Sequence, residues 1–358
     1  MHARRVSRAI VLALLLAAIA ALSHALTQFV QRYALKSGQL DVPNERSSHV
    51  QPTPRGGGIS FVLTTLLGTV VLFAMGFIAQ PVVVAVLIGG SLVAVVGMID
   101  DRRGLAARWR FLAHLSASGC AVALLTGWHA ALLSSYPSPV RAAALLLAVI
   151  GGVWSINLTN FMDGIDGIAA TEAITVCVGA ALCAWIMGSP ITTLILPLVL
   201  AAGATGFLLH NWPPARIFMG DAGSGFLGFM IATLTLVSLM ATPTLAWCWI
   251  LLFGVFVTDA TFTITRRLFR GERVTAAHRR HGYQHLSRRF VSHRTVTLAV
   301  AVVNLCWLLP WACVVAFGWL SGVTAFVIAY TPLVCLAIWS HAGAPESGSI
   351  DGAQTRVS

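Results

Sequence analysis

Charged residues are scarce in this sequence. Only 10% of its 358 residues are Asp, Glu, Lys or Arg, whereas an ordinary soluble domain carries about 25%. So few charges do not cover the surface of a soluble globular enzyme, and a hydrophobic content of 57% excludes a disordered chain. Both observations indicate a polytopic membrane protein.

Acids are scarcer than bases, and Lys36 is the only lysine. Twelve Asp and Glu stand against 23 Lys and Arg, which gives a net charge of +11. This excess favours anionic lipid headgroups or phosphate-bearing substrates as partners, and we expect no nucleic acid. A Cys-x-x-Cys pair is also absent, and the seven cysteines lie in apolar runs. They are interpreted as packing residues, which argues against disulfides and thiolate metal sites.

Eleven apolar runs approach the roughly 20 residues that a membrane-spanning helix needs. They are 9–30, 59–79, 82–99, 111–128, 142–156, 168–187, 191–209, 223–240, 244–264, 296–317 and 319–339. The first run is long enough to span, so we interpret it as a membrane helix and not as a removed signal peptide. The predicted fold is an all-α polytopic membrane protein with about eleven transmembrane helices. It comprises one integral domain, residues 1–341, and a short, disordered cytoplasmic tail, residues 342–358.

The charges are distributed unequally between the two sides of this layout. Nineteen of the 23 basic residues fall in the loops that follow odd-numbered runs or in the C-terminal tail. The positive-inside rule therefore predicts that these loops and the C-terminus are cytoplasmic and that the N-terminus is outside. Ten of the twelve acids lie in or beside the same loops or in the tail; Glu172 and Asp259 lie inside predicted spans. We expect the chemistry of the protein on the cytoplasmic face.

The first two cytoplasmic loops carry phosphate-binding and acidic motifs. Arg46 and Arg55 precede the triple glycine 56–58, which stands at the start of a helix. This arrangement suits an anion site, and a solvated hinge is the alternative. The second loop contains Asp100 and Asp101. On a helix their side chains diverge by about 100°, so one carboxylate could face a metal and the other a substrate. The alternative is internal pairing with Arg102 and Arg103.

The third and fourth cytoplasmic loops add more acids. Asn157, Asn160, Asp163 and Asp166 stand together without a base, and a helical turn would bring the two acids to one face. The fourth loop holds Phe218, which could stack on a base, and the run Gly220-Asp221-Ala-Gly-Ser224. A lone carboxylate beside free backbone N–H groups suits a magnesium ion that bridges phosphates.

The fifth cytoplasmic loop is the most basic one. It contains eight arginines between 266 and 289 and three histidines, His278, His281 and His285. The histidine spacing predicts one face of a helix, and a cationic lid over phosphates explains it better than zinc or a segment that touches anionic lipid. Within the membrane, Asp259 is expected to pair with Arg266 or Arg267.

In this order, the five loops resemble those of the polyprenyl-phosphate N-acetylhexosamine-1-phosphate transferases, glycosyltransferase family 4. This superfamily includes the phospho-N-acetylmuramoyl-pentapeptide transferases and the WecA-like enzymes. The resemblance rests on Asp100-Asp101, on Asn157 to Gly167 and on Gly220 to Ser224 taken together. It implies that undecaprenyl phosphate attacks a UDP-N-acetylhexosamine in a bacterial inner membrane and that UMP is released on the cytoplasmic face.

The resemblance also assigns roles to residues. Asp221 would hold magnesium, for which manganese could substitute, and the catalytic set would be Asp100, Asp101, Asp163, Asp166 and His281. The substrate-binding set would be Arg46, Arg55, Asn157, Asn160, Phe218, His278, Arg279, Tyr283 and Gln284. Beyond the substrates and the lipid bilayer, a second copy of the chain is a further expected partner.

One departure concerns the donor sugar. Much of the superfamily has His-x-His-His in the last loop, whereas this sequence has His281-Gly-Tyr283-Gln284. The run from His278 to His285 resembles the branch that starts O-antigen in lipopolysaccharide biosynthesis with a 6-deoxy sugar such as N-acetylfucosamine or N-acetylquinovosamine; N-acetylglucosamine is the alternative. Two other classes of function stay open, namely a transporter coupled through its carboxylates and an inactive scaffold of a polysaccharide assembly complex.

Overall fold

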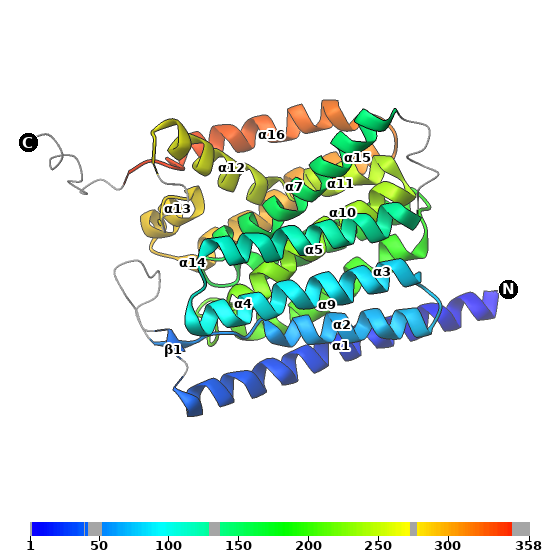
Figure 1. The fold of residues 1–358 in the computed structure, drawn as a ribbon, viewed down its shortest axis with the longest axis horizontal. Coiled ribbons are helices and arrows are strands. Elements are labelled where there is room, and N and C mark those ends of the chain that lie inside the picture. Colours follow the sequence, from blue (N-terminus) through cyan, green and yellow to red (C-terminus); the bar gives the residue numbers. More distant parts are fainter. Residues whose placement is uncertain (1, 39, 42–51, 129–136, 273–277, 346–358) are drawn as a thin grey trace, which may run out of the picture.

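The computed structural model describes residues 2–38, 40–41, 52–128, 137–272 and 278–345, with the backbone alone for residues 2–8. The predicted site residue Arg46 and the end of the predicted tail, residues 346–358, lie outside this part of the chain. The helices pack side by side as an elongated bundle, with α1 and α16 along opposite edges (Figure 1).

The described chain is almost entirely helical. Its helices are α1 (His2–Ser37), α2 (Ile59–Ala74), α3 (Gln80–Ala85), η1 (Val86–Gly90), α4 (Ser91–Arg103), α5 (Ala107–Trp128), α7 (Ser138–Met162), α8 (Ile168–Ile186), α9 (Ile191–Asn211), α10 (Asp221–Ala241), α11 (Pro243–Leu252), α12 (Gly254–Phe269), α13 (Gly282–Phe290), α14 (His293–Val303), η2 (Asn304–Leu308), α15 (Leu309–Ala316) and α16 (Gly322–Trp339). The segments η1 and η2 are π-helical turns that continue α3 into α4 and α14 into α15. Two short strands, β1 (Leu40–Asp41) and β2 (Thr53–Pro54), pair antiparallel.

Each of the eleven predicted runs coincides with a helix or with a helix and its continuation. Among the described residues, eight helices are long and apolar enough to cross a membrane by length and composition. The run 244–264 is not one straight helix, because α11 and α12 meet at a bend of 67° after Leu252 and together form a ninth candidate span. Helices α8 and α10 occupy the centre of the bundle, and 78% of the residues in the apolar segment of each are buried. In α1, at the edge, only 11% of the residues of that segment are buried.

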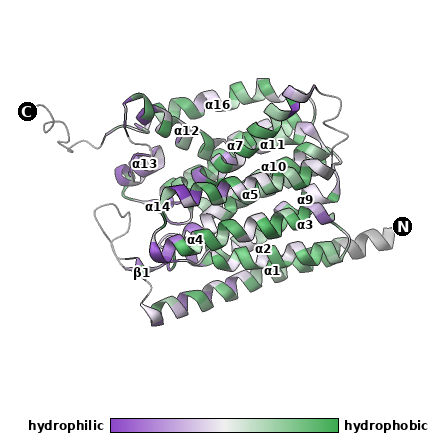
Figure 2. Ribbon diagram, viewed as in Figure 1, coloured by the Kyte–Doolittle hydropathy of each residue, from purple (hydrophilic) through white to green (hydrophobic). Residues whose placement is uncertain are grey.

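The hydrophilic residues concentrate at one end of the bundle, the end that carries β1 and α13 (Figure 2). The N-terminus of α1 lies at the opposite end (Figure 1). An apolar helix satisfies its own backbone hydrogen bonds within the membrane, so the irregular segments that hold polar side chains gather where the helices end. The described acidic loops therefore meet at this end.

Glycines allow the acidic helix ends to approach closely. A side chain at Gly97 of α4 would lie 2.5 Å from the backbone nitrogen of Ala222 in α10, and one at Gly58 would lie 2.6 Å from the Cα of Gly223. Because small residues let helix backbones pack in contact, the last turn of α4 and the residues before α2 both meet the start of α10. This contact brings three of the predicted motifs together.

Candidate active site

Arg55 links two acids from different helices. It directly follows β2, and its guanidinium lies 2.9 Å from the carboxylate of Asp101 at the end of α4 and 2.8 Å from that of Asp221 at the start of α10. Burial disfavours the charged guanidinium, but the carboxylates of Asp221 and Asp101 outweigh it and raise the pKa of Arg55. Arg55 was predicted to bind phosphate; in this structure it neutralises the acids of the site.

Asp101 also fixes the start of α10. Its two carboxylate oxygens accept hydrogen bonds from the backbone nitrogens of Asp221, at 2.9 Å, and Ala222, at 3.3 Å. A carboxylate at a helix N-terminus satisfies unpaired N–H groups and interacts favourably with the helix dipole. Asp101 therefore positions Asp221.

Asp100 faces a different set of partners. Its carboxylate accepts hydrogen bonds from the backbone nitrogen of Leu105 at 2.5 Å and from Arg110 at 2.6 Å. The alternative from the sequence, pairing with the adjacent Arg102 and Arg103, is wrong. Arg110 pairs with Asp100, and Arg55 pairs with Asp101. The carboxyl of Asp100 also lies within hydrogen-bonding reach of the carboxyl of Asp221.

Asp163 is the fourth acid of this cluster. It lies in the loop after α7, and burial, reinforced by the negative charge of Asp221, raises its pKa well above the ordinary value. Asn160, in the last turn of α7, donates hydrogen bonds of 3.0 Å to both Asp221 and Ser224. We define Asp100, Asp101, Asp163 and Asp221 as the acidic cluster.

Asp166 serves a neighbouring position. α7 ends at Met162 and α8 begins at Ile168, so the predicted helical turn through Asp163 and Asp166 is wrong and the two acids point to different partners. The carboxylate of Asp166 accepts a hydrogen bond of 3.0 Å from the backbone of Ala215 and lies 3.3 Å from His293. It therefore anchors the loop that leads to Phe218.

Phe218 lies on the other side of this loop. Its backbone bonds to Pro54 and Gly57, which fastens the loop between α9 and α10 to the segment that holds Arg55. The phenyl ring is half-buried. The segments around Arg55, Asp166 and Phe218 thus border the acidic cluster on one side.

His281 borders the acidic cluster on the opposite side, but not as predicted. The histidines were expected on one helical face, whereas α13 begins only at Gly282, so His278 and His281 precede it. Their rings nevertheless stack with centroids 5.0 Å apart. Burial, together with the positive charges of nearby groups, lowers the pKa of His278 to about 3, so it contributes a neutral ring at pH 7.

Asp259 holds the His281 segment, a role that the sequence analysis missed. The carboxylate lies 3.3 Å from His281 Nδ1 and accepts hydrogen bonds of 2.9 Å and 2.8 Å from the backbone nitrogens of Gly282 and Tyr283. The expected pairing with Arg266 or Arg267 is wrong: Arg266 donates to the backbone oxygen of Ala342 and Arg267 pairs with Glu272.

A cavity of about 770 Å³ joins this polar region to the side of the bundle. Its polar wall includes the predicted residues Asn157, Asn160, His278, His281, Tyr283 and Gln284, together with Arg110, which the sequence analysis did not select. Its apolar wall comes from α5, α7 and α12 and includes Phe111, Ile150 and Ile264. Ile150 and Phe111 are more than half exposed on the bundle surface, so the cavity reaches the membrane-facing side.

Tyr283 and Gln284 shape the polar end of this cavity. The Tyr283 hydroxyl donates a hydrogen bond of 2.9 Å to the backbone oxygen of Phe161, and the Gln284 side chain accepts one of 3.2 Å from the backbone nitrogen of His281. Arg279 lies in the same segment, where its backbone oxygen accepts a hydrogen bond from Arg288.

The acidic cluster fits a magnesium ion that is shared with a substrate. Among the residues described, no three His, Cys, Asp or Glu side chains are arranged to hold a metal ion together. Magnesium, however, usually takes one or two protein carboxylates and completes its shell with water and phosphate oxygens. The close approach of the Asp100 and Asp221 carboxyls favours a shared proton or cation between them.

Comparisons with known proteins identify the family of the chain. The model of the family "Glycosyl transferase family 4" matches residues 83–239, which include the acidic cluster. The chain is 32% identical to a probable undecaprenyl-phosphate N-acetylglucosaminyl 1-phosphate transferase of Bacillus subtilis over 78% of each chain. It is 27% identical to a decaprenyl-phosphate N-acetylglucosaminephosphotransferase of Mycolicibacterium smegmatis over 87% of this chain and 84% of that one.

A more distant group is matched as well. A phospho-N-acetylmuramoyl-pentapeptide-transferase of Moorella thermoacetica is 32% identical over 66% of this chain and 79% of its own length. The resemblance expected from the five loops is thereby confirmed. The chain belongs to glycosyl transferase family 4, within the superfamily of polyprenyl-phosphate sugar-1-phosphate transferases.

Proposed function

We propose that this protein transfers an N-acetylhexosamine 1-phosphate from a UDP-sugar to undecaprenyl phosphate and releases UMP. The observation that carries the proposal is the cavity of about 770 Å³, whose wall changes from apolar helix surface to His278, His281 and Asn160. A lipid with a long hydrocarbon chain and a phosphate headgroup has a matching apolar part and polar part. Relatives named for undecaprenyl and decaprenyl phosphate acceptors support this assignment.

The acceptor phosphate would lie at the polar end of the cavity. Arg110 lines this end and pairs with Asp100, so the phosphate would meet Arg110 as a counter-charge and Asp100 as the group that orients it or accepts its proton. His281, whose orientation Asp259 fixes, would donate a hydrogen bond to a phosphate oxygen. The neutral ring of His278 and the guanidinium of Arg279 would complete this side.

The donor nucleotide would bind on the opposite side of the acidic cluster. There Phe218 offers a half-buried ring for the uracil, and Asp166 holds the supporting loop through Ala215. Asn157 and Asn160 line the cavity, where they would contact the donor between the two sides. The diphosphate would then lie between Arg55 and Asp163. Gly56, next to Arg55, has no other atom within 4 Å of where a side chain would begin, which leaves room for a phosphate close to the backbone.

The chemistry is a phosphoryl transfer between these two sides. An oxygen of the lipid phosphate bonds to the β-phosphorus of the donor, the bond from that phosphorus to the bridging oxygen breaks, and UMP leaves with the bridging oxygen. Magnesium, or manganese in its place, bound by Asp221 would neutralise the charge that develops on the diphosphate. Asp101 holds Asp221 in position, and Arg55 shifts between the acids and the phosphates as the donor binds.

We further propose a 6-deoxy donor, N-acetylfucosamine or N-acetylquinovosamine, with O-antigen as the product pathway and N-acetylglucosamine as the slower donor. Tyr283 and Gln284 stand where much of the superfamily has histidines, and both line the cavity beside Gly164. A tyrosine whose hydroxyl is engaged by Phe161 presents ring carbons to the substrate. An apolar pocket discriminates against one added hydroxyl by only about 10²-fold.

The membrane placement is part of the same proposal. The charged end of the bundle would face the cytoplasm, where UDP-sugars are made, and the membrane would be the bacterial inner membrane. The loops with the bases support this orientation through the positive-inside rule. A homodimer would leave the cavity open if α16 or α1, at the two edges, formed the interface.

Purified protein in nanodiscs tests the reaction. We expect UMP and a lipid-linked sugar from undecaprenyl phosphate, magnesium and UDP-sugar, and neither product without the lipid. A transporter or an inactive scaffold would give no UMP. The ratio of kcat/KM among the three UDP-sugars tests the donor: it should favour a 6-deoxy sugar and shift in Tyr283→His, while the matched control Tyr283→Phe keeps the ring. A preference for UDP-N-acetylglucosamine that Tyr283→His leaves unchanged refutes the 6-deoxy assignment.

A further inference from the structure

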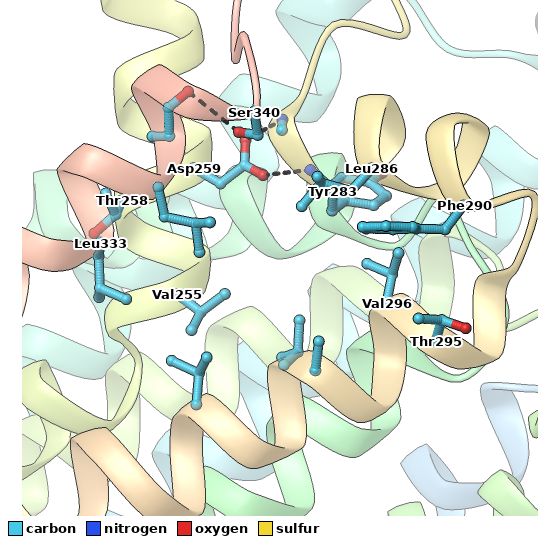
Figure 3. Close-up of a pocket in the computed structure, with 16 residues that line it drawn as sticks. Val255, Thr258, Asp259, Tyr283, Leu286, Phe290, Thr295, Val296, Leu333 and Ser340 are labelled. Atoms are coloured by element: carbon cyan, nitrogen blue, oxygen red, sulfur yellow. Dashed lines mark hydrogen bonds between the residues drawn. The ribbon is translucent and has the colours of Figure 1, made fainter.

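A second, smaller cavity lies between α12, α13, α14 and α16 (Figure 3). Its volume is about 100 Å³ and its walls are almost entirely apolar. The residues that form most of it are Val255, Leu286, Val296, Val300, Leu333 and Leu336. We call it the α12–α16 slot.

The slot opens sideways and runs along the helices. Phe290 and Leu336, which line it, are 49% and 38% exposed, so its entrance is on the outer surface of the bundle. It extends along α16 from Leu333 to Ser340 at the charged end, and seven residues of helix span roughly 10 Å. Half of a hydrocarbon core is about 15 Å thick, so the slot covers most of one leaflet from its polar boundary inward.

An arginine stands beside the polar end of the slot. Arg289 precedes Phe290, and its guanidinium lies 4.9 Å from the ring centre of Trp339, which precedes Ser340 of the slot wall. Arg289 is exposed, and among the ion pairs of the described residues none joins it to an acid. Tryptophan and arginine at a helix end are typical of the level of lipid headgroups.

The one acid of the slot wall does not oppose an anion at this entrance. The Asp259 carboxylate accepts hydrogen bonds from the backbone of Gly282 and Tyr283 and lies beside the His281 ring, so its charge is engaged on the α13 side (Figure 3). The slot thus combines an apolar channel that covers most of one leaflet with the positive charge of Arg289 at its polar end, for which the described residues supply no acidic partner.

We propose that the α12–α16 slot binds one anionic phospholipid. An acyl chain occupies the channel between α12, α14 and α16, and the phosphate of the headgroup binds Arg289. The site is separate from the catalytic cavity, yet Tyr283 and Asp259 belong to its wall. A bound lipid therefore packs against the segment that orients His281 and restrains α13.

Lipid retention measured by native mass spectrometry tests the site without any sugar donor. Detergent-solubilised protein is titrated with phosphatidylglycerol or with phosphatidylcholine of the same acyl chains. Arg289→Ala removes the charge, and Ala299→Phe, at an exposed position of the slot wall, fills the entrance. Arg32→Ala and Ala142→Phe, at exposed positions outside the slot, are the matched controls.

The proposal expects one phosphatidylglycerol per chain, retained by the wild type and both controls. Arg289→Ala should bind it roughly fivefold more weakly, from the loss of one surface arginine, and Ala299→Phe should not retain it. Hydrogen exchange of residues 282–303 should slow when phosphatidylglycerol is bound to the wild type.

Three results would overturn the proposal. Equal retention by Ala299→Phe would remove the slot as the site, and equal retention of phosphatidylcholine would remove the charge recognition. Displacement of phosphatidylglycerol by one equivalent of undecaprenyl phosphate would instead make the slot part of the acceptor path. None of these measurements depends on turnover, so they leave the transferase assignment to its own assay.

Discussion

Replacing Asp259 by Asn should disable the enzyme although Asp259 lies outside the acidic cluster. The Asp259 carboxylate is the common acceptor for His281 Nδ1 at 3.3 Å, for the backbone nitrogens of Gly282 and Tyr283 at 2.9 Å and 2.8 Å, and for the Thr263 hydroxyl at 3.2 Å. Asparagine has one acceptor oxygen, and its amide group would face one of these N–H donors. The substitution therefore breaks the link between α12 and the start of α13.

The size of the effect follows from these contacts. Hydrogen bonds to a charged group contribute about 1.5–3 kcal/mol each. Asp259→Asn loses one of the two backbone hydrogen bonds and leaves the other with an uncharged acceptor, which together should cost about 3 kcal/mol of local stability. The segment with His281 would then shift, and a displacement of about 1 Å in a group that positions substrate costs roughly 100-fold in rate. We expect kcat to fall about 100-fold, with KM for the donor changed less than about threefold.

A double-mutant cycle checks the reasoning. UMP release is measured for Asp259→Asn, His281→Ala and the double variant; if Asp259 acts through His281, the double variant is no slower than His281→Ala. Glu272→Gln is the control for loss of a nearby negative charge, because Glu272 pairs with Arg267 and Arg280 and not with His281. Losses that multiply in the double variant, or a kcat of Asp259→Asn within twofold of wild type, refute the positioning role.

Three further predictions concern the acidic cluster and the orientation. The pKa of Asp163 is higher in the native state than in the unfolded state, so between these two values the native state binds more protons and the stability falls as the pH rises. In EDTA, Asp163→Asn should therefore have a higher melting temperature than wild type at pH 7.5 and the same melting temperature near pH 4. An equal difference in melting temperature at both pH values contradicts this. Asp221→Asn should abolish turnover without unfolding, and wild-type activity should vanish in EDTA and return with magnesium; turnover that survives either treatment removes the metal assignment. In a cysteine-free background, a cysteine at Ser37 should react only from the cytoplasmic side and one at Ser138 only from outside, and the reverse labelling inverts the topology.

The helical architecture could be predicted because hydrophobic length carries it. Each apolar run corresponds to a helix or to a helix and its continuation, since a membrane span must satisfy its backbone internally. The bend between α11 and α12 was not predictable, because Leu252 and Gly254 lie within one uninterrupted apolar stretch. Only packing against neighbouring helices distinguishes such a break from a straight span.

The identity of the site residues was predictable, but their partners were not. Acids at helix ends stand out in a sequence with 12 acidic residues, and Asp100, Asp101, Asp163 and Asp221 do meet. Pairing was inferred from neighbours along the chain, whereas the ion pairs of Arg55 span 46 and 166 positions. Partners such as His281 for Asp259, 22 positions apart, depend on helix packing that local sequence does not encode. Even Arg110, ten positions from Asp100, lies beyond the adjacent arginines from which the pairing was inferred.

Tyr283 connects two segments to which the proposed mechanism gives different roles. Its hydroxyl bonds to the Phe161 backbone beside Asp163, and its own backbone nitrogen bonds to Asp259. Burial, reinforced by the charge of Asp259, raises the Tyr283 pKa well above its ordinary value, so the hydroxyl remains a neutral donor throughout the physiological range. Gly164 must lack a side chain, since a Cβ there would collide with this hydroxyl. One tyrosine thus ties the loop of Asp163 to the segment of His281, so in the proposed mechanism a substitution at this position would change both the contacts with the sugar and the placement of His281.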